Sequence, residues 1–376
     1  MMDFSQFWDS LGGYAYILVG FGFFFVAHLI NVIYKSSIIC SKDKDSFSDS
    51  GEGVSVIITA NNRSEELKEN LEYFLTQDYP DFEVIVVDEC SEDNTQEVLA
   101  DIQQRYPNLK TTRIFPDTKF RSTKKLAINI GILAAKYDRL LFSETICRPS
   151  SRNWLKETCL AFTPDTAVVL GYANYITGKG NVSIRRIFRF LRFLELQVLV
   201  RSGHAVWGDG RNMGYRKKFY IAERGFSKNS QSYMGYDNEM VKALSKYGKV
   251  KVVRKEEALV SINDIKKKTW REDFTYYYQN KRNWPFMTLL KSNIDSFFRI
   301  AGCILGILLI FMGILHNYVI GCILLMFLID FVVINIYLKI QKEKKLFLTS
   351  FIVSSIGFLY EWYYNVYAIF TNKKWR

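Results

Sequence analysis

The sequence has 376 residues, 49% of them hydrophobic, and carries 50 Lys and Arg against 38 Asp and Glu, a net charge of +12. This balance suits a phosphate-bearing ligand or an anionic membrane surface, and it is equally typical of the cytoplasmic parts of a membrane protein. Since no basic helix carries base-reading side chains, we expect no nucleic-acid partner. Six cysteines without a CxxC pair and only three histidines argue against disulfides and a histidine-based metal centre.

The chain opens with a candidate membrane span. After an N-terminal tail at 1–13, residues 14–34 carry no formal charge and are long enough to cross a bilayer as a helix. A polar linker at 35–53 follows, and its lysines place it on the cytoplasmic side by the positive-inside rule. We therefore expect the N-terminus outside and the next domain in the cytoplasm.

Residues 54–285 alternate strand and helix patterns. Runs of β-branched and apolar residues predict strands at Val54–Ala60, Phe82–Asp88, Thr111–Phe115 and Arg139–Ser143. Stretches with helical spacing lie between them at Glu65–Leu75, with Ser64 as its cap, Asp93–Arg105 and Lys124–Lys136. This alternation predicts an α/β fold with a Rossmann-like, mostly parallel sheet and helices on both faces. The carboxyl ends of such strands form the edge where nucleotides bind.

A different helix is predicted at Ile184–Val200. Arg185, Arg189 and Arg192 share one of its faces, and apolar residues form the other. This pattern fits a helix lying in the membrane interface and fits equally an ordinary packed surface helix.

The region 286–376 is predicted to return to the membrane. Apolar spans are expected at about 298–315 and 318–338, joined by a tight hairpin, and a basic loop follows. The last apolar segment, 346–370, contains Glu361-Trp362, so we expect it to be bent, re-entrant or in the interface plane. Asp330 lies inside a span without an assigned role, near Asn335. The sequence thus predicts a multi-pass membrane protein with a cytoplasmic domain.

An ordered set of motifs runs through the predicted domain. It comprises a polar turn at Ala60–Glu65, the strand tip at Asp88, Lys124-Lys125, Ser143–Pro149, a Gly-rich stretch at Gly208–Lys217, Gly235–Met240, and Gln279–Trp284. In this order the motifs resemble those of membrane-anchored family-2 glycosyltransferases with a GT-A catalytic domain. The resemblance implies a UDP- or GDP-sugar donor, a divalent cation (Mg²⁺ or Mn²⁺) and transfer of the sugar with inversion.

The resemblance also implies roles for individual residues. It makes Asp237 the catalytic base that deprotonates the acceptor hydroxyl. Donor-binding roles fall on Asn62, Glu65, Asp88, Lys124, Glu144, Arg211, Arg282 and Trp284. From the residues alone, simpler readings stay open: a capped turn at Asn62, a solvated Lys124, and a helix N-terminal acid at Asp237. Arg282 and Trp284 also fit a juxtamembrane basic and aromatic belt.

Two positions depart from the family pattern. Tyr236 stands where the family usually has a glutamate before the residue that matches Asp237, and the tip of the strand at Arg139–Ser143 is the other. Ser143-Glu144-Thr145 stands where the family has the two aspartates of its DxD motif, which hold the ribose and the metal. Serine and threonine hydroxyls are weak ligands for Mg²⁺ or Mn²⁺, so Glu144 is the one candidate metal ligand at this tip. The sequence leaves open whether a divalent cation binds.

Two functions follow as hypotheses. The first is an inverting glycosyltransferase that moves a single sugar from a nucleotide-sugar donor to a lipid-linked or other membrane-proximal glycan. The second is a non-catalytic membrane scaffold or regulator that keeps the fold and lacks metal-dependent chemistry.

Overall fold

The computed structural model describes residues 12–41, 51–115, 119, 122–177, 182–231, 236–264, 266–343 and 346–370. Among the predictions, those on the tail at 1–11, the linker at 42–50, Gly235 and the basic C-terminus at 371–376 lie outside the described residues. The chain divides into two compact units, one formed by Met1–Lys42 and Trp284–Val366 and the other by Asp43–Asn283 and Tyr367–Arg376.

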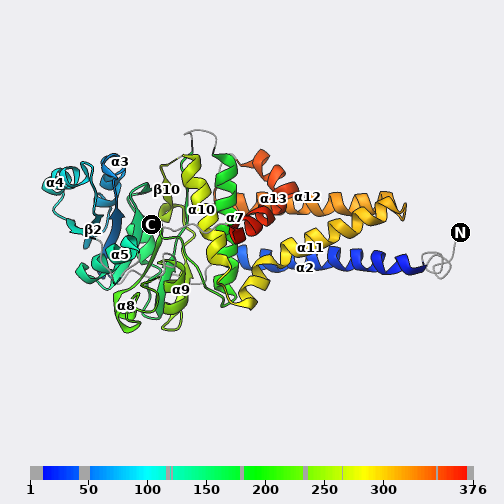
Figure 1. Ribbon diagram of the computed structural model, residues 1–376, viewed down its shortest axis with the longest axis horizontal. Coiled ribbons are helices and arrows are strands. Elements are labelled where there is room, and N and C mark those ends of the chain that lie inside the picture. Colours follow the sequence, from blue (N-terminus) through cyan, green and yellow to red (C-terminus); the bar gives the residue numbers. More distant parts are fainter. Residues whose placement is uncertain are drawn as a thin grey trace. The chain divides into compact units, whose positions relative to one another are not determined.

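The larger unit is built on a seven-stranded sheet in the order β3-β2-β1-β4-β8-β6-β9, of which Figure 1 labels β2. Its strands are β1 (Val54–Ala60), β2 (Phe82–Glu89), β3 (Leu109–Ile114), β4 (Arg139–Glu144), β6 (Thr166–Leu170), β8 (Met213–Arg216) and β9 (Lys249–Val252). The first four are mutually parallel, β8 is antiparallel to both neighbours, and β9 is parallel to β6. A smaller sheet joins β5 (Cys147–Pro149), β10 (Val260–Ile262) and β7 (Ala173–Tyr175). The predicted α/β fold is confirmed.

Strand β1 lies between β2 and β4 in the parallel part of the sheet, and its residues are the kind that such a buried position requires. Val54, Val56, Ile57 and Ile58 are fully buried, as expected of a parallel strand covered on both faces. Helix α5 (Thr123–Ala134) packs directly on β1 and β2. A side chain at Gly131 would bring its Cβ within 2.7 Å of Ile57 Cγ2, so only glycine permits this approach of helix to sheet.

The remaining helices of this unit surround the sheets. They are α3 (Ser64–Leu75), α4 (Thr95–Arg105), α6 (Trp154–Cys159), α7 (Ser183–Arg201), α8 (Lys217–Ala222), α9 (Asn238–Leu244) and α10 (Lys267–Lys281), with a 3₁₀ turn at Glu256–Ala258. The prediction of Ser64 as a cap was wrong, because Ser64 is the first helical residue of α3. Its backbone N–H donates instead to Asp93 Oδ2 at 3.1 Å, and Asp93 Oδ1 accepts from Thr95 N at 3.1 Å. One carboxylate thus stabilises the beginnings of both α3 and α4.

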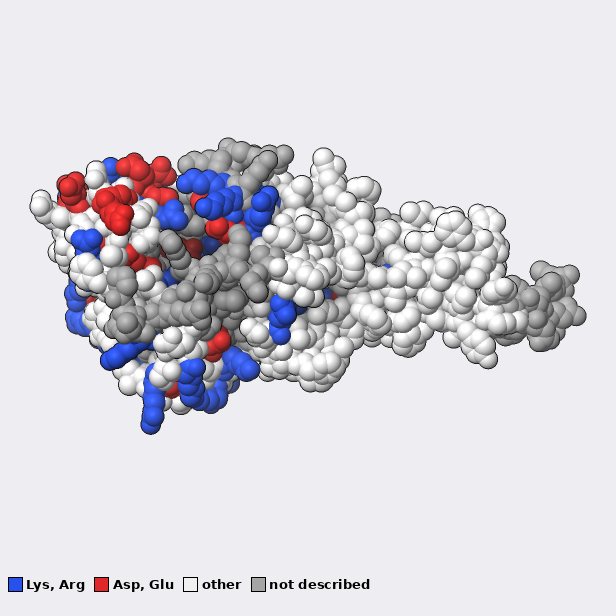
Figure 2. Space-filling model, viewed as in Figure 1, with Lys and Arg blue, Asp and Glu red and all other residues white. Residues whose placement is uncertain are grey.

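The smaller unit consists mainly of long apolar helices. They are α2 (Ala15–Ile39), preceded by a 3₁₀ turn at Gly12–Tyr14, α11 (Phe286–Phe311), α12 (His316–Ile340) and α13 (Phe347–Phe370), whose last residues belong to the larger unit. In the described part of the chain, the segment Gly12–Ile39, α11 and α12 are long and apolar enough to cross a membrane. Their visible face carries few charged side chains (Figure 2). Helix α13 continues through Glu361-Trp362 without a break.

Buried ionic groups join three of these helices. His28 of α2 lies with Nδ1 3.3 Å from Asp295 Oδ1 and Nε2 3.2 Å from Asp330 Oδ1. Arg299 of α11 places Nε 3.2 Å from Asp330 Oδ2. Asp330 therefore pairs with residues of other helices, while Asn335 donates to Ser350 Oγ at 2.8 Å. Because buried charges require partners, this network favours one arrangement of α2, α11 and α12.

Gly214 offers a test of the packing of β8. A Cβ at this position would lie 2.3 Å from the backbone oxygen of Leu140 and 2.5 Å from Leu141 Cδ2. Since a strand backbone cannot move away alone, we expect Gly214→Ala to lower the free energy of unfolding by about 1–3 kcal/mol. Thermal and denaturant unfolding of the purified protein measures this. The control is Gly321→Ala in α12, where an added methyl group would meet nothing within 4 Å and should not destabilise the protein. Equal midpoints for the two variants would contradict the packing.

Candidate functional site

A cleft of about 1130 Å³ opens at the carboxyl edge of the parallel strands, within the larger unit. Thr59 of β1, Glu89 of β2 and Glu144 of β4 line it at the strand ends, and Lys124 lines it at the start of α5. Thr59 and Glu144 are direct partners in the β1–β4 register, so their side chains emerge at the same level of the sheet. The sheet topology thus brings polar groups from distant parts of the sequence into one cavity.

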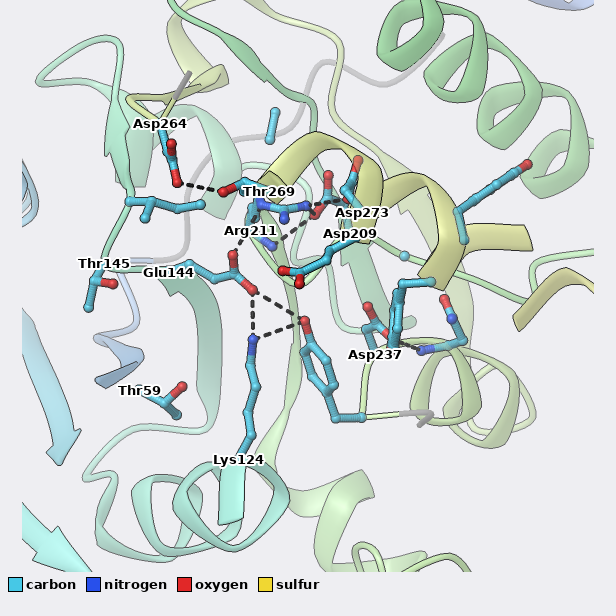
Figure 3. A pocket seen from close by; sticks show the side chains of 18 of the residues that line it. Thr59, Lys124, Glu144, Thr145, Asp209, Arg211, Asp237, Asp264, Thr269 and Asp273 are labelled. Carbon is cyan, nitrogen blue, oxygen red and sulfur yellow. Dashed lines mark hydrogen bonds and ion pairs between the residues drawn. The ribbon is translucent and has the colours of Figure 1, made fainter. Parts of the chain in front are cut away.

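Glu144 is held between two cations (Figure 3). Lys124 Nζ lies 2.6 Å from its Oε1, and Arg211 Nε lies 3.1 Å from its Oε2. The Tyr236 hydroxyl accepts from Lys124 Nζ at 3.2 Å and lies 3.3 Å from Glu144 Oε1. Burial by itself raises the pKa of Glu144, but the charges of Arg211 and Lys124 outweigh it and lower that pKa to about 2. Glu144 is therefore ionised at physiological pH.

A second network of charges continues from Arg211. Asp273 of α10 accepts from Arg211 Nη1 at 2.9 Å through Oδ1, and its Oδ2 lies 2.9 Å from Arg189 Nη1 and 3.2 Å from Arg192 Nη1. Asp209 pairs with Arg189 through Oδ2 and accepts from the backbone N of Arg211 at 3.1 Å through Oδ1. Burial raises the pKa of Asp273, yet the three arginines hold it well below its usual range. These ion pairs tie α7, α10 and the segment before β8 to one wall of the cleft.

Asp237 is a carboxylate of a different kind. It is 4% exposed at the start of α9, and its Oδ1 accepts from the Asn238 backbone N–H and from the Tyr276 hydroxyl, both at 2.8 Å. Burial raises its pKa to about 6, with the charge of Asp209 adding to the shift and the two hydrogen bonds opposing it. A carboxyl with such a pKa exchanges a proton near neutral pH, as a general base requires.

Further groups complete the lining. Burial raises the pKa of Glu89, against the lowering effect of Lys124 and of hydrogen bonds from Thr59 and Thr123. Aromatic rings cover another part of the wall: Tyr172, Phe193, Trp207, Tyr276 and Tyr277. The cleft therefore combines a charged region with an aromatic one, a composition typical of ligand sites.

Four of the nine predicted site residues meet in this cleft: Lys124, Glu144, Arg211 and Asp237. Among the residues that the structure describes as lining it, Asn62, Glu65, Asp88 and Arg282 do not occur. Trp284 belongs to the smaller unit. The donor-binding roles of these five residues stay predictions.

The local structure shows where the side chains of Asn62 and Asp88 lie instead. Asn62 adopts a left-handed backbone (φ 53°), and its Oδ1 accepts from Glu92 N at 2.8 Å. This geometry agrees with the simpler interpretation of Asn62 as part of a capped turn. Asp88 accepts from Ser91 N at 3.0 Å and from Gln96 Nε2 at 3.1 Å. Because successive strand residues point to opposite faces, the next residue along β2, Glu89, lines the cleft.

The other two predicted residues of this unit lie at its surface. Glu65 pairs with Lys68 on the exposed side of α3. Arg282 follows the last residue of α10 with an exposed side chain. Neither Glu65 nor Arg282 lines the cleft. The resemblance implies that both contact the nucleotide, and the structure offers no support for these two contacts.

Several residues that line the cleft were not predicted as site residues. Arg189 and Arg192 were noted only as part of a charged face of α7, yet both line the cleft, and α7 buries Arg189 together with its apolar neighbour Phe190. The structure therefore supports the packed-helix alternative for this segment. Asp209 was noted only within the Gly-rich stretch, and Asp273 lies in α10 outside any recognised motif. The spacing of Arg189 and Arg192 was the one signal for this network.

The charged residues of the cleft do not fit a divalent cation. Both carboxylate oxygens of Glu144 already face Lys124 or Arg211. Within the described part of the chain, no group of three or more His, Cys, Asp or Glu side chains is arranged to hold a metal ion. Mg²⁺ in phosphate-binding sites is held by one or two carboxylates together with substrate phosphates and water, and the one carboxylate at this strand tip already has a cation at each oxygen.

Known proteins resemble the chain at the level of family and fold. Residues 55–222 match the family model described as glycosyl transferase family 2. Poly-beta-1,6-N-acetyl-D-glucosamine synthase of Staphylococcus epidermidis is 31% identical over 90 residues, which is 24% of this chain and 21% of that protein. A second sequence of that name and species is 30% identical over the same length. The chain thus matches about a fifth of the length of these curated relatives.

A solved structure extends the resemblance to the fold. The mannosyltransferase PcManGT from Pyrobaculum calidifontis, in complex with GDP-Man and Mn²⁺, superposes with a TM-score of 0.58 at 14% identity, covering 93% of this chain and 99% of that one. At this identity the similarity establishes a shared GT-A fold.

The environment of Asp237 predicts a gain of stability on its replacement. Because the folded state binds this proton more tightly than the unfolded chain does, stability falls as pH rises from about 4, and the cost is fully present above pH 6. A shift of this size corresponds to about 3 kcal/mol. Asp237→Asn keeps an oxygen acceptor for Tyr276 and Asn238, so at pH 8 it should unfold at a higher temperature than the unaltered protein. At pH 4 the difference should vanish, and an equal difference at both pH values would contradict this assignment.

Proposed function

We propose that the protein transfers a sugar from a nucleotide-sugar donor to a hydroxyl group with inversion at the anomeric carbon. Its residues 55–222 match the model of glycosyl transferase family 2, which supports this proposal. The observation that carries this proposal is the position of Asp237. Its carboxyl group, with a pKa of about 6, lines the same cleft as the cations Lys124 and Arg211. A base and an anion-stabilising region in one cavity are what displacement of a nucleoside diphosphate requires.

The proposed step uses only residues of this chain. Asp237 takes the proton of the acceptor hydroxyl while the hydroxyl oxygen forms a bond to the anomeric carbon. The bond from that carbon to the diphosphate oxygen breaks, and the nucleoside diphosphate leaves with the bonding electrons. Lys124 and Arg211 stabilise the negative charge that develops on the diphosphate. Attack from the face opposite the leaving group inverts the anomeric configuration.

The donor is a UDP- or GDP-sugar in this proposal. Asn61 and Arg63, which follow β1, line the cleft beside Glu89 at the end of β2, and they offer donors and acceptors for a base edge. The fold shared with a mannosyltransferase solved with GDP-Man supports a nucleotide-sugar donor.

The acceptor is a lipid-linked or other membrane-proximal glycan, and the catalytic domain faces the cytoplasm. Three helices that are long and apolar enough to cross a membrane support this placement. The aromatic part of the cleft supports a sugar acceptor, because half-buried rings such as Tyr172 and Tyr276 line it and offer apolar surface to a glycan.

One observation favours a second candidate, a non-catalytic membrane scaffold or regulator. The strand tip Ser143-Glu144-Thr145 offers a single carboxylate, and that carboxylate is paired with two cations. Under this alternative the chain binds nucleotide sugars without turning them over.

Replacing the base separates the two candidates. We expect Asp237→Asn to reduce release of nucleoside diphosphate from UDP- and GDP-sugars by about 100-fold or more, since a positioned base contributes 10²–10⁴ to the rate. The assay uses the full-length protein in detergent or vesicles with membrane glycolipid extracts as acceptor source. Asp101→Asn, at an exposed carboxylate paired with Arg105 in α4, is the matched control and should keep full activity. Equal rates for both variants would exclude Asp237 as the base.

The pH dependence gives an independent check on the same residue. Because the base must be deprotonated, kcat/KM should rise about tenfold per pH unit below pH 6 and level off above it. A rate that is flat between pH 5 and pH 7 would show that no group with this pKa controls the reaction.

A further inference from the structure

One wall of the cleft, the charged wall, consists of Lys124, Arg189, Arg192, Arg211, Glu144, Asp209 and Asp273, and its three acidic side chains already have cationic partners. Glu144 has Lys124 at Oε1 and Arg211 at Oε2. Asp273 has Arg211 at Oδ1 and two arginines at Oδ2, and Asp209 pairs with Arg189. A divalent cation bound here would have to displace an ammonium or guanidinium group from a half-buried carboxylate, which leaves that group without its partner.

The cations, by contrast, still have hydrogen-bonding capacity toward the cleft. An ammonium has three donors, and the contacts of Lys124 with Glu144 and Tyr236 account for two of them. Arg211 uses Nε toward Glu144 and Nη1 toward Asp209 and Asp273. The side chains of Lys124 and Arg211 are 21% and 14% exposed, so both are reachable from the cavity that they line.

The local charge around Lys124 and Arg211 and the helix beside them favour an anion at this point of the cleft. In this network four cations, Lys124, Arg189, Arg192 and Arg211, face three carboxylates, Glu144, Asp209 and Asp273. The rest of the cleft adds Arg63 and four acids, Glu89, Asp237, Asp264 and Glu272. Lys124 also lies in the first turn of the 12-residue helix α5, whose N-terminal N–H groups and dipole attract negative charge. Glu144 lies between the two cations, with Lys124 Nζ 2.6 Å from Oε1 and Arg211 Nε 3.1 Å from Oε2, so it holds them on either side of itself.

We propose that Lys124 and Arg211, positioned by Glu144, form a metal-independent binding site for the diphosphate of the nucleotide donor. The inference rests on the proposed function and specifies how the leaving group is stabilised. Glu144 is a positioning residue in this site and not a metal ligand. The two cations supply the charge-assisted hydrogen bonds that a bridging metal ion would otherwise provide.

Nucleotide binding without turnover tests the site. UDP and GDP are titrated calorimetrically into the full-length protein, first with EDTA and then with excess Mn²⁺ or Mg²⁺. At least one nucleotide should bind in EDTA, with a Kd that changes less than about threefold on adding metal. In EDTA, Lys124→Ala and Arg211→Ala should each weaken binding at least tenfold, and Lys124→Arg should restore most of it.

The variant Glu144→Gln shows whether Glu144 positions the two cations or binds a metal ion. The amide oxygen can still accept from Lys124 or Arg211, so binding in EDTA should persist within a few-fold, whereas removal of a metal ligand would abolish metal-dependent binding. Binding that appears only with Mn²⁺ or Mg²⁺ and is lost in Glu144→Gln would overturn this inference, and the sugar transfer with Asp237 as base would still stand. Absence of UDP and GDP binding under both conditions would overturn the proposed function as well. The comparison of EDTA with metal needs no variant, so a misfolded substitution does not affect the test.

Discussion

The guanidinium group of Arg211 contacts carboxylates from three separate parts of the chain, and the charged wall of the cleft depends on this convergence. Glu144 comes from the end of β4, Asp209 from the segment before β8, and Asp273 from α10. In a buried site, each of these charges is tolerated only because the others are present. The network therefore fixes α10 and the segment before β8 against the edge of the parallel strands. It also fixes the direction in which the cations face the cavity.

The same cavity shifts the pKa values of two carboxyl groups in opposite directions. Glu144 stays ionised because two cations contact it, whereas Asp237 is held by hydrogen bonds from Tyr276 and its own helix, which do not compensate its burial. Environments that separate the pKa values of neighbouring acids assign different roles to them. Glu144 can organise charge without exchanging protons, and Asp237 can exchange protons near neutral pH. The cost of burying Asp237 is a stability–function compromise of the kind expected at an active site.

The ends of the strands could be predicted from the sequence more accurately than the side chains that line the cleft beside them. Continuous β-branched runs located β1, β2 and β4 to within a residue, and parallel order followed from the alternation with helices. Asp88 was predicted as the site residue at the end of β2, but its neighbour Glu89 lines the cleft. Successive residues of a strand point to opposite faces, and the family motif does not show where β2 ends. Asp273 could not be predicted, because its partners lie 62 to 84 positions away and no local pattern marks such contacts. Arg189 and Arg192 had the right spacing, but a charged helical face looks the same whether it meets lipid, solvent or buried acids.

Two departures from the family pattern meet at one point in the structure. Ser143-Glu144-Thr145 replaces the paired aspartates, and Tyr236 stands where the family has a glutamate before its base. The Tyr236 hydroxyl lies 3.3 Å from Glu144 Oε1, and its ring centroid lies 4.4 Å from Lys124 Nζ. A glutamate at this position would place a second carboxylate against Glu144 and raise the demand for a divalent cation. A tyrosine instead offers a neutral hydroxyl and a ring face that attracts the ammonium group. The loss of carboxylates at the strand tip and at position 236 thus changes the local charge in the same direction, toward a site in which Lys124 and Arg211 carry the positive charge.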